Sequence, residues 1–316
     1  MEKSLEMRTW IGLGWLICPG EGSDEPDNDL IRRWMTTVLK LKVKHLEYLE
    51  SSWESDEFQI PPTIYISENL VSLNLGGVTM SSTEFVSLPS LRVLELSYVI
   101  FPDDLAIEKL ISGCTTLESL IIVRNSYDKI QVLRVCSQSL LRFTHSPDSD
   151  EDLVENLSLV IDAPSLKYLR LCDYRTVFLV IYDYSRCEPL PLFRNLSSLR
   201  LNPTPDSWEM LPIFLESCPN LKSLVLGSRH DQDKGRINTF PGPRCLLSSL
   251  EYVEIERPLE GEDMEMKLVR YLLENSTILK KLTLSVAKCS KKEESVIFRE
   301  LLSIPRLSTT CQVVVG

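Results

Sequence analysis

The sequence has little of what active sites are usually built from. It contains three histidines and twelve glycines among 316 residues. His45, His145 and His230 fall in separate segments, so their spacing assembles no Ser/His/Asp or Cys/His set. No H-E-x-x-H, G-x-x-x-x-G-K-[ST] or G-x-G-x-x-G stretch occurs. We therefore expect no enzyme activity, no catalytic residue, no cofactor and no metal site.

The cysteines lack the spacing of a disulfide framework or a zinc site. There are nine, an odd number, and no C-x-x-C pair occurs. Several, such as Cys114, Cys218 and Cys289, lie near the boundaries of the repeats described below. We interpret them as small buried residues in a reducing compartment. The expected location is intracellular, in the cytoplasm, the nucleus or both.

An excess of positive charge and long apolar runs are also missing. Lysine and arginine total 34 against 45 acidic residues, which gives a formal net charge of −11. This balance argues against a partner that is nucleic acid or a membrane surface. No run approaches the roughly 18 apolar residues of a membrane span. The short apolar run Trp10–Cys18 lacks the positively charged flank of a signal peptide.

A secreted receptor fragment is the competing interpretation of these N-terminal residues. It would require cleavage after about Gly20 and glycans on Asn195 or Asn275, which begin N-x-[ST] sequons. Short sequons arise often by chance and matter only after secretion. The intact mass of the native protein distinguishes the two interpretations.

What the sequence does contain is a repeated leucine frame. In CPNLKSLVL (Cys218–Leu226) the apolar residues Leu221, Leu224 and Leu226 follow the form L-x-x-L-x-L. Clear copies of the frame begin at Leu70, Leu91, Leu117, Leu166, Leu196, Leu250 and Leu279, and weaker ones at Leu46 and Leu140. Their spacing is roughly the period of about 20–29 residues of leucine-rich repeats. The prediction is an α/β leucine-rich-repeat solenoid with irregular repeats, a parallel sheet on the concave face, and a helical or irregular convex side.

The predicted organisation runs in three parts. Residues 1–29 are an unassigned N-terminal segment and loop, and residues 30–240 are repeats that begin with a capping helix from Leu30 to about Lys40. Val177–Tyr182 (VFLVIY) is predicted to be an additional strand, and Asp183–Pro191 has no clear place. In residues 241–316 we predict alternating strands and helices at 250–255, 262–273, 279–286, 293–302 and 312–315.

Strand parity predicts where a partner would bind. In L-x-x-L-x-L the second and third apolar residues point into the core, so the residues between and beside them point to the concave sheet face. These outward positions include Asn74, Glu95, Ile121, Arg170, Arg200, Asn202, Val225, Glu254 and Glu256. The partner-binding residues that we predict are Glu95, Arg170, Arg200, Asn202 and Glu254.

Two of these residues form a predicted basic spot. Arg170 and Arg200 fall on neighbouring strands, so they could anchor an acidic segment or a phosphate of a partner. The alternative is that both arginines pair with nearby acidic residues of the same chain.

Several segments together resemble a known family. LIRRWMTTVLKLKVKHLEYL (Leu30–Leu49), with Trp34, is similar to the segment that links the F-box to the repeats in plant F-box/FBD/LRR-repeat proteins. SENLVSLNLGGV, PSLRVLELSYVIF and CPNLKSLVL are of that family's repeat type. SSLEYVEIERPLEG and MKLVRYLLENSTILKKLTLSV resemble its FBD module. The resemblance covers nearly all of the chain beyond residue 27 and implies that residues 241–316 are FBD-like C-terminal repeats and a cap.

The resemblance implies a function in protein recognition. In this family the repeats are thought to hold a substrate protein, while the F-box binds the adaptor of a cullin–RING ubiquitin ligase. No stretch before Trp34 resembles the L-P-x-x-L-L-x-x-I-L run or the K-R-W segment of an F-box. We therefore predict a non-catalytic recognition scaffold, similar to the substrate-binding part of an SCF-type receptor. Its partners are an unknown substrate protein and, where an F-box is supplied elsewhere, the SCF adaptor and cullin.

The alternative to this function is a remnant without an F-box, or a competitive binder of the same substrates, with no role in a ligase.

A further comparison supports the intracellular interpretation. Secreted leucine-rich-repeat receptors carry asparagine three positions after the last leucine of the frame. Here only one of the eight corresponding positions is asparagine; they are Val78, Val99, Asn125, Tyr174, Thr204, Arg229, Pro258 and Ala287.

Overall fold

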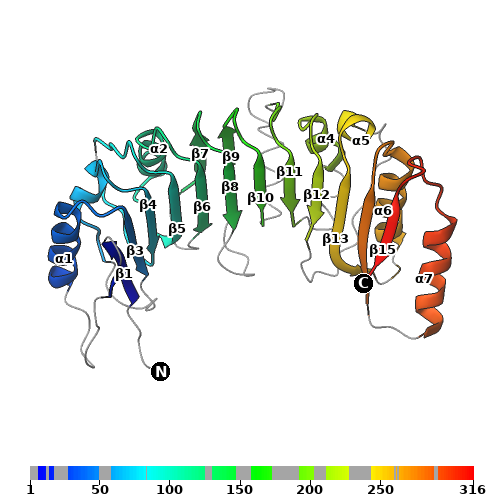
Figure 1. The fold of residues 1–316 in the computed structure, drawn as a ribbon, viewed down its shortest axis with the longest axis horizontal. Coiled ribbons are helices and arrows are strands. Elements are labelled where there is room, and N and C mark those ends of the chain that lie inside the picture. The colour runs from blue at the N-terminus through cyan, green and yellow to red at the C-terminus, as the bar shows by residue number, and fades with distance from the viewer. Residues whose placement is uncertain are drawn as a thin grey trace. The chain divides into compact units, whose positions relative to one another are not determined.

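The computed structural model consists of two compact units, Met1–Ser165 and Leu166–Gly316 (Figure 1). We describe each unit by itself. The residues that the structure describes are 6–11, 14–17, 28–49, 58–82, 84–124, 130–146, 158–172, 192–202, 211–227, 243–259, 261, 263–287 and 291–316. The predicted strand at Val177–Tyr182 and the unplaced segment Asp183–Pro191 lie outside them.

The first unit is built on a mainly parallel sheet. Its parallel strands follow chain order: β3 (His45–Leu49), β4 (Ser72–Gly76), β5 (Val93–Val99), β6 (Ser119–Arg124) and β8 (Arg142–Ser146). An antiparallel pair, β1 (Glu6–Ile11) and β2 (Gly14–Ile17), extends the sheet beyond β3. The sequence left this pair unassigned, because these two strands carry no copy of the leucine frame.

The second unit has a parallel sheet of the same kind. Its strands are β10 (Tyr168–Leu171), β11 (Ser198–Leu201), β12 (Ser223–Leu226), β13 (Tyr252–Leu259), β14 (Lys281–Val286) and β15 (Gln312–Val315). Each strand pairs in parallel with the next. The register shifts between Ile255 and Pro258 in β13, where proline has no N–H for the ladder.

The predicted parity is confirmed in both units. On β4, for example, Leu73 and Leu75 are buried while Ser72 and Asn74 are half-buried. On β12, Leu224 and Leu226 are fully buried while Ser223 and Val225 are half-buried. The L-x-x-L-x-L frame therefore forms a core that is continuous through each unit, and the fold is the predicted α/β leucine-rich-repeat solenoid.

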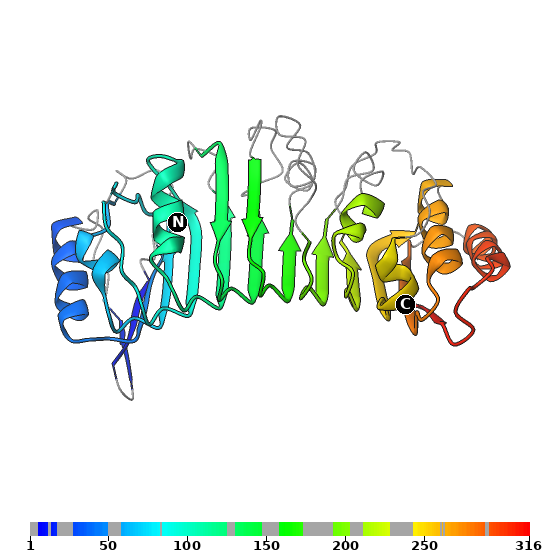
Figure 2. The same cartoon turned by 90° about the horizontal axis from the view of Figure 1, so that it is seen from above.

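The segments between the strands are helical or irregular, and they pack behind the sheets. In the first unit these are α1 (Asn28–Lys40), the 3-10 turn η1 (Pro62–Ile66) and α2 (Asp104–Ser112). In the second they are α4 (Leu211–Glu216), α5 (Arg244–Ser248), α6 (Asp263–Asn275) and α7 (Lys291–Ser303). Figure 2 shows α2, α4 and α6 each on one side of the strands of their own unit.

The two terminal helices of the described chain agree closely with the prediction. In α1, Ile31, Met35 and Val38 recur at helical spacing and are buried. Asp29 lies in the first turn of α1, and its carboxylate pairs with Arg32 at 3.1 Å. In α7 the buried residues include Ile297 and Leu301, again at i and i+4.

A small second sheet replaces the helix behind part of the first unit. β7 (Val132–Cys136) pairs in parallel with β9 (Ser158–Asp162), and β7 lies beside α2. Leu133 and Val135 on β7 are buried. This pair was not predicted, because its alternating pattern lies between copies of the frame.

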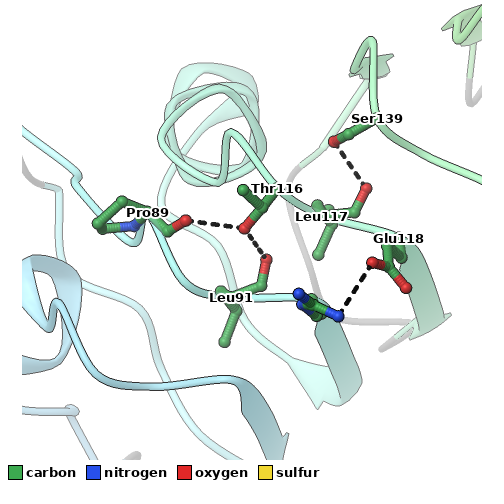
Figure 3. A network of polar contacts seen from close by, with 7 residues as sticks. Pro89, Leu91, Thr116, Leu117, Glu118 and Ser139 are labelled. Carbon is green, nitrogen blue, oxygen red and sulfur yellow. Dashed lines mark hydrogen bonds and ion pairs between the residues drawn. The ribbon is translucent and has the colours of Figure 1, made fainter.

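Polar side chains just before the first leucine of the frame join consecutive repeats. The Thr116 hydroxyl donates to the carbonyl oxygens of Pro89 (2.8 Å) and Leu91 (3.1 Å), and Ser139 donates to that of Leu117 at 2.8 Å (Figure 3). In the second unit Asn220 and Ser249 donate to the carbonyls of Arg194 and Pro219, and Ser308, which precedes no copy of the frame, donates to that of Leu279. This row satisfies turn carbonyls that would otherwise lack partners in the protein.

The described cysteines are mainly core residues. All six are free thiols, and five of them are buried, with Cys136 the exposed exception. Burial raises the pKa of the Cys114 and Cys245 thiols to about 12. These thiols are protonated at neutral pH and pack as small apolar groups.

Candidate partner-binding faces

Each unit has a sheet face that carries the side chains alternating with the buried frame. We call this the open face. Its residues lie opposite one another across neighbouring strands, so they form rows that run perpendicular to the strands. Because all five predicted partner-binding residues are on described strands or directly after them, the structure places each one.

The open face of the first unit carries two glutamates with an asparagine between them. Glu47, Asn74 and Glu95 are in register on β3, β4 and β5, and the row continues through Ile121 and Thr144. The Asn74 amide donates to Glu47 Oε1 at 3.1 Å. Partial burial, and secondarily the negative charge of Glu47, raise the pKa of Glu95. This face therefore disfavours further negative charge.

The open face of the second unit carries charges of both signs. Arg170 on β10 lies directly opposite Arg200 on β11, and the same row continues through Val225 and Glu254 to Thr283. The two arginines are therefore on neighbouring strands, as the spacing predicted. From β10 to β13 the row reads basic, basic, apolar and acidic.

The contacts of the two arginines differ. Arg200 Nη2 forms a short ion pair with Glu256 Oε2, which reaches across from β13. Arg170 Nε donates to Cys172 Sγ at 3.2 Å, a weak acceptor. Among the residues that the structure describes, no carboxylate lies within ion-pair distance of Arg170. Among the described residues, the alternative interpretation, that the arginines pair with acidic residues of the same chain, therefore holds for Arg200 and not for Arg170.

A glycine makes room for Asn202. Asn202 directly follows β11, and Gly227 directly follows β12; the backbone N–H of Gly227 donates to Leu201 O at 2.7 Å. A Cβ built on Gly227 would lie 2.1 Å from Asn202 Oδ1, so the Asn202 amide occupies the space above this glycine. Asn202 Oδ1 is buried and has no hydrogen-bond partner within the described ranges. The sequence analysis did not identify Gly227, although a glycine directly after the frame is the available signal.

A second row of the open face carries aromatic residues that the sequence analysis also missed. It runs through Tyr168, Ser198, Ser223 and Tyr252, two residues before the row of Arg170. Tyr252 is 46% exposed, and Lys280 Nζ lies 5.9 Å from the centre of its ring. Strand parity would have found these tyrosines, because i and i−2 share one face.

Comparisons with known proteins agree with the resemblance seen in the sequence. A family model described as FBD matches residues 241–284, and one described as FBD-associated F-box protein At5g56370, LRR repeats, matches residues 31–178. An F-box model is not among the matches. No solved structure matches the chain.

Curated relatives match over most of their own length. The chain is 51% identical to F-box/LRR-repeat protein 13 of Arabidopsis thaliana in an alignment 348 positions long, which covers 92% of the chain and 77% of the relative. It is 52% identical to F-box/FBD/LRR-repeat protein At1g78750 of the same plant, over 93% of the chain and 77% of the relative. FBD-associated F-box protein At1g66310 is 46% identical over 95% of the chain and 78% of the relative.

These findings bear on chemistry as well as on fold. Proteins of this group are non-catalytic adaptors, in agreement with the prediction that the chain is not an enzyme. In the described part of the chain, no helix has both the length and the apolar character needed to cross a membrane. With identity above 50% over more than nine-tenths of its residues, the chain belongs to the plant F-box/FBD/LRR-repeat protein family.

Proposed function

We propose that the chain is a protein-recognition scaffold that serves as the substrate-binding part of an SCF-type ubiquitin-ligase receptor. The observation that carries this proposal is the pair of open faces on the repeat sheets, where charged side chains alternate with the buried leucines. Half-buried side chains on strands are held in place before binding, so a partner orders few of them on contact. Family membership supplies the link to ubiquitin ligases.

The residues that we propose to contact the partner are those predicted from parity. In the first unit this is Glu95, and in the second they are Arg170, Arg200, Asn202 and Glu254. Each lies on an open face, and all but Glu254, which is exposed, are half-buried. Charged groups at such positions contribute mainly to the choice and orientation of the partner.

We propose that recruitment of the SCF adaptor and cullin depends on an F-box, the module that the names of the relatives carry. We also propose an intracellular location, since the buried thiols suit a reducing compartment. The domain boundaries 1–29, 30–240 and 241–316 stay predictions; the match of the FBD model from residue 241 supports the last of them.

Affinity capture tests the proposal. The full chain is used as bait in plant cell extract, and mass spectrometry identifies both a specific partner and any ligase subunits. Arg170→Glu in the second unit is compared with Lys267→Glu, which makes the same charge change on an exposed residue of α6 behind that sheet. We expect Arg170→Glu to lose the partner and Lys267→Glu to retain it. Equal retention by both variants, and by Glu95→Lys, would contradict binding on the open faces.

The second candidate function is a competitive binder without a role in a ligase. The same capture distinguishes the two functions: a specific partner recovered without adaptor and cullin supports the competitive binder, whereas recovery of all three supports the receptor.

A further inference from the structure

The row of the second unit has an order of charges that restricts what can lie on it. Arg170 and Arg200 occupy β10 and β11, Val225 follows on β12 and Glu254 on β13. Like charges directly opposite each other on neighbouring strands are unfavourable. Glu256 already compensates the charge of Arg200, so an anion placed between the two arginines would chiefly compensate that of Arg170.

The hydrogen-bonding capacity of the two arginines is only partly used. Arg200 holds Glu256 through Nη2, and its Nε is buried, so a partner cannot reach that atom and the available donors are mainly those of Arg170. The contact of Arg170 that the structure gives is with a thiol sulfur. A carboxylate can accept two parallel N–H bonds from a guanidinium, so it is the ligand that fits this end of the row.

The other end of the row selects the opposite charge. Glu254 is exposed, and Glu256 lies two residues further along β13. Both would repel a second acidic group placed there. A partner that carries one acidic group at β10–β11 and a basic group at β13 matches the row, whereas a run of phosphates or acidic residues does not.

Strand spacing converts this charge order into a sequence pattern. Neighbouring strands are about 4.8 Å apart, so Val225 and Glu254 lie roughly 7 Å and 12 Å from the midpoint between β10 and β11. In an extended peptide, side chains on one face recur about every 6.6 Å. Three alternate residues of a peptide that crosses the strands therefore reach the arginine pair, Val225 and Glu254 in turn.

We propose that the open face of the second unit binds an extended protein segment with the pattern acidic–x–apolar–x–basic, in either chain direction. The acidic side chain lies between Arg170 and Arg200, the apolar one contacts Val225, and the basic one pairs with Glu254. Tyr168 and Tyr252 in the neighbouring row flank the segment. This inference rests on the proposed function and names the class of partner that the second unit recognises.

Two peptides of equal composition test the spacing. Fluorescein-labelled nine-residue peptides with central Glu-Thr-Leu-Thr-Lys or Thr-Glu-Leu-Lys-Thr are titrated against the full chain, with binding read by fluorescence anisotropy. Net charge and hydrophobicity are identical, so nonspecific attraction cancels. We expect the first peptide to bind roughly tenfold more tightly, since the second cannot reach both charged ends of the row. Equal affinities would overturn the proposed spacing.

Two charge reversals test which residue reads which position. Arg170→Glu leaves the Arg200–Glu256 pair in place, and Glu254→Arg replaces an exposed side chain. We expect Arg170→Glu to prefer Lys-Thr-Leu-Thr-Lys, and Glu254→Arg to prefer Glu-Thr-Leu-Thr-Glu. A gain of affinity for a new peptide cannot result from misfolding. Unchanged preferences in both variants would overturn the assignment.

The outcomes also separate this inference from the proposed function. If affinity capture loses the partner with Arg170→Glu but the peptides show no preference for charge order, the scaffold function stands and the pattern is wrong. If capture is insensitive to every open-face variant, the proposed function itself fails.

Discussion

The two units bury the same leucine frame but differ in how the charges of their open faces are compensated. In the first, Asn74 bridges toward Glu47, and the nearby Glu95 carries a raised pKa. In the second, Arg200 on β11 pairs with Glu256 on β13, while Arg170 contacts the thiol of Cys172. The leucines of the frame are constrained by packing against the neighbouring repeats, whereas the residues between them face solvent and are constrained only by their neighbours on the open face and by a binding partner. Repeats can therefore keep one core and carry different surfaces.

The largest effect is expected where the units are alike. Leu94→Ala on β5 and Leu224→Ala on β12 each empty a fully buried position. We expect each to lower the free energy of unfolding by about 2–5 kcal/mol. Their half-buried neighbours, Val93→Ala and Val225→Ala, should cost roughly 1 kcal/mol or less, because less apolar area is lost. Urea denaturation measures all four, and equal costs for a leucine and its neighbour would contradict the parity.

The next effect distinguishes the units at one frame position. Gly76 and Gly227 each directly follow the third apolar residue of the frame. A Cβ on Gly76 would lie 2.8 Å from the Leu49 side chain, whereas on Gly227 it would lie 2.1 Å from Asn202 Oδ1. We expect Gly227→Ala to destabilise the protein by about 1–3 kcal/mol through overpacking. Gly76→Ala should cost less, because the tip of a leucine side chain can move aside.

A double variant identifies the cause of the Gly227→Ala effect. If the clash is with the Asn202 amide, Asn202→Ala in the same chain should restore most of the lost stability, measured by thermal unfolding. A double variant no more stable than Gly227→Ala would mean that the backbone at Gly227, and not the amide, requires glycine.

A smaller loss of stability, similar in the two units, is expected when a hydroxyl that joins consecutive repeats is removed. Thr116 donates to two carbonyls in the first unit, and Ser249 donates to Pro219 O and Cys245 O in the second. Thr116→Val and Ser249→Ala should each cost about 1 kcal/mol. Thr115→Val, at the exposed neighbouring residue, serves as the control and should be close to neutral. Loss of stability in the control alone would show that the hydroxyl bonds contribute little.

The leucine frame made most of the fold predictable. Its period predicted the parallel strands, and its parity placed Glu95 and Arg170 on open faces, because packing against both neighbouring repeats imposes the pattern. What escaped prediction has no such periodic constraint. The pair β1–β2 and the sheet of β7 and β9 lie outside the frame. The contact between Asn202 and Gly227 was not predicted, because it depends on the register in which β11 and β12 pair and on how the Asn202 side chain turns.

The smallest effect is a difference in pH dependence between one glutamate of each unit: Glu95 on the open face of the first, and Glu251, which directly precedes β13, in the second. The pKa of Glu95 is raised from 4.5 chiefly by burial, so the folded state holds that proton more tightly, and stability is lost as the pH rises above 4.5 through the folded pKa. Glu251 in the second unit is the reverse: a hydrogen bond from Lys280 lowers its pKa, so its contribution is present above 4.5 and lost as the pH falls through the folded pKa. Glu95→Gln should therefore raise stability at pH 7, and Glu251→Gln should lower it slightly. The difference for Glu95 should shrink in acid, because its carboxyl is then protonated in both the folded and the unfolded state. The difference for Glu251 should shrink as the pH falls below 4.5 through its lowered folded pKa. Urea titrations at pH 7 and pH 3.5 check the opposite signs. The same sign for both variants at pH 7 would mean that the protein does not shift the pKa values of these two glutamates in opposite directions.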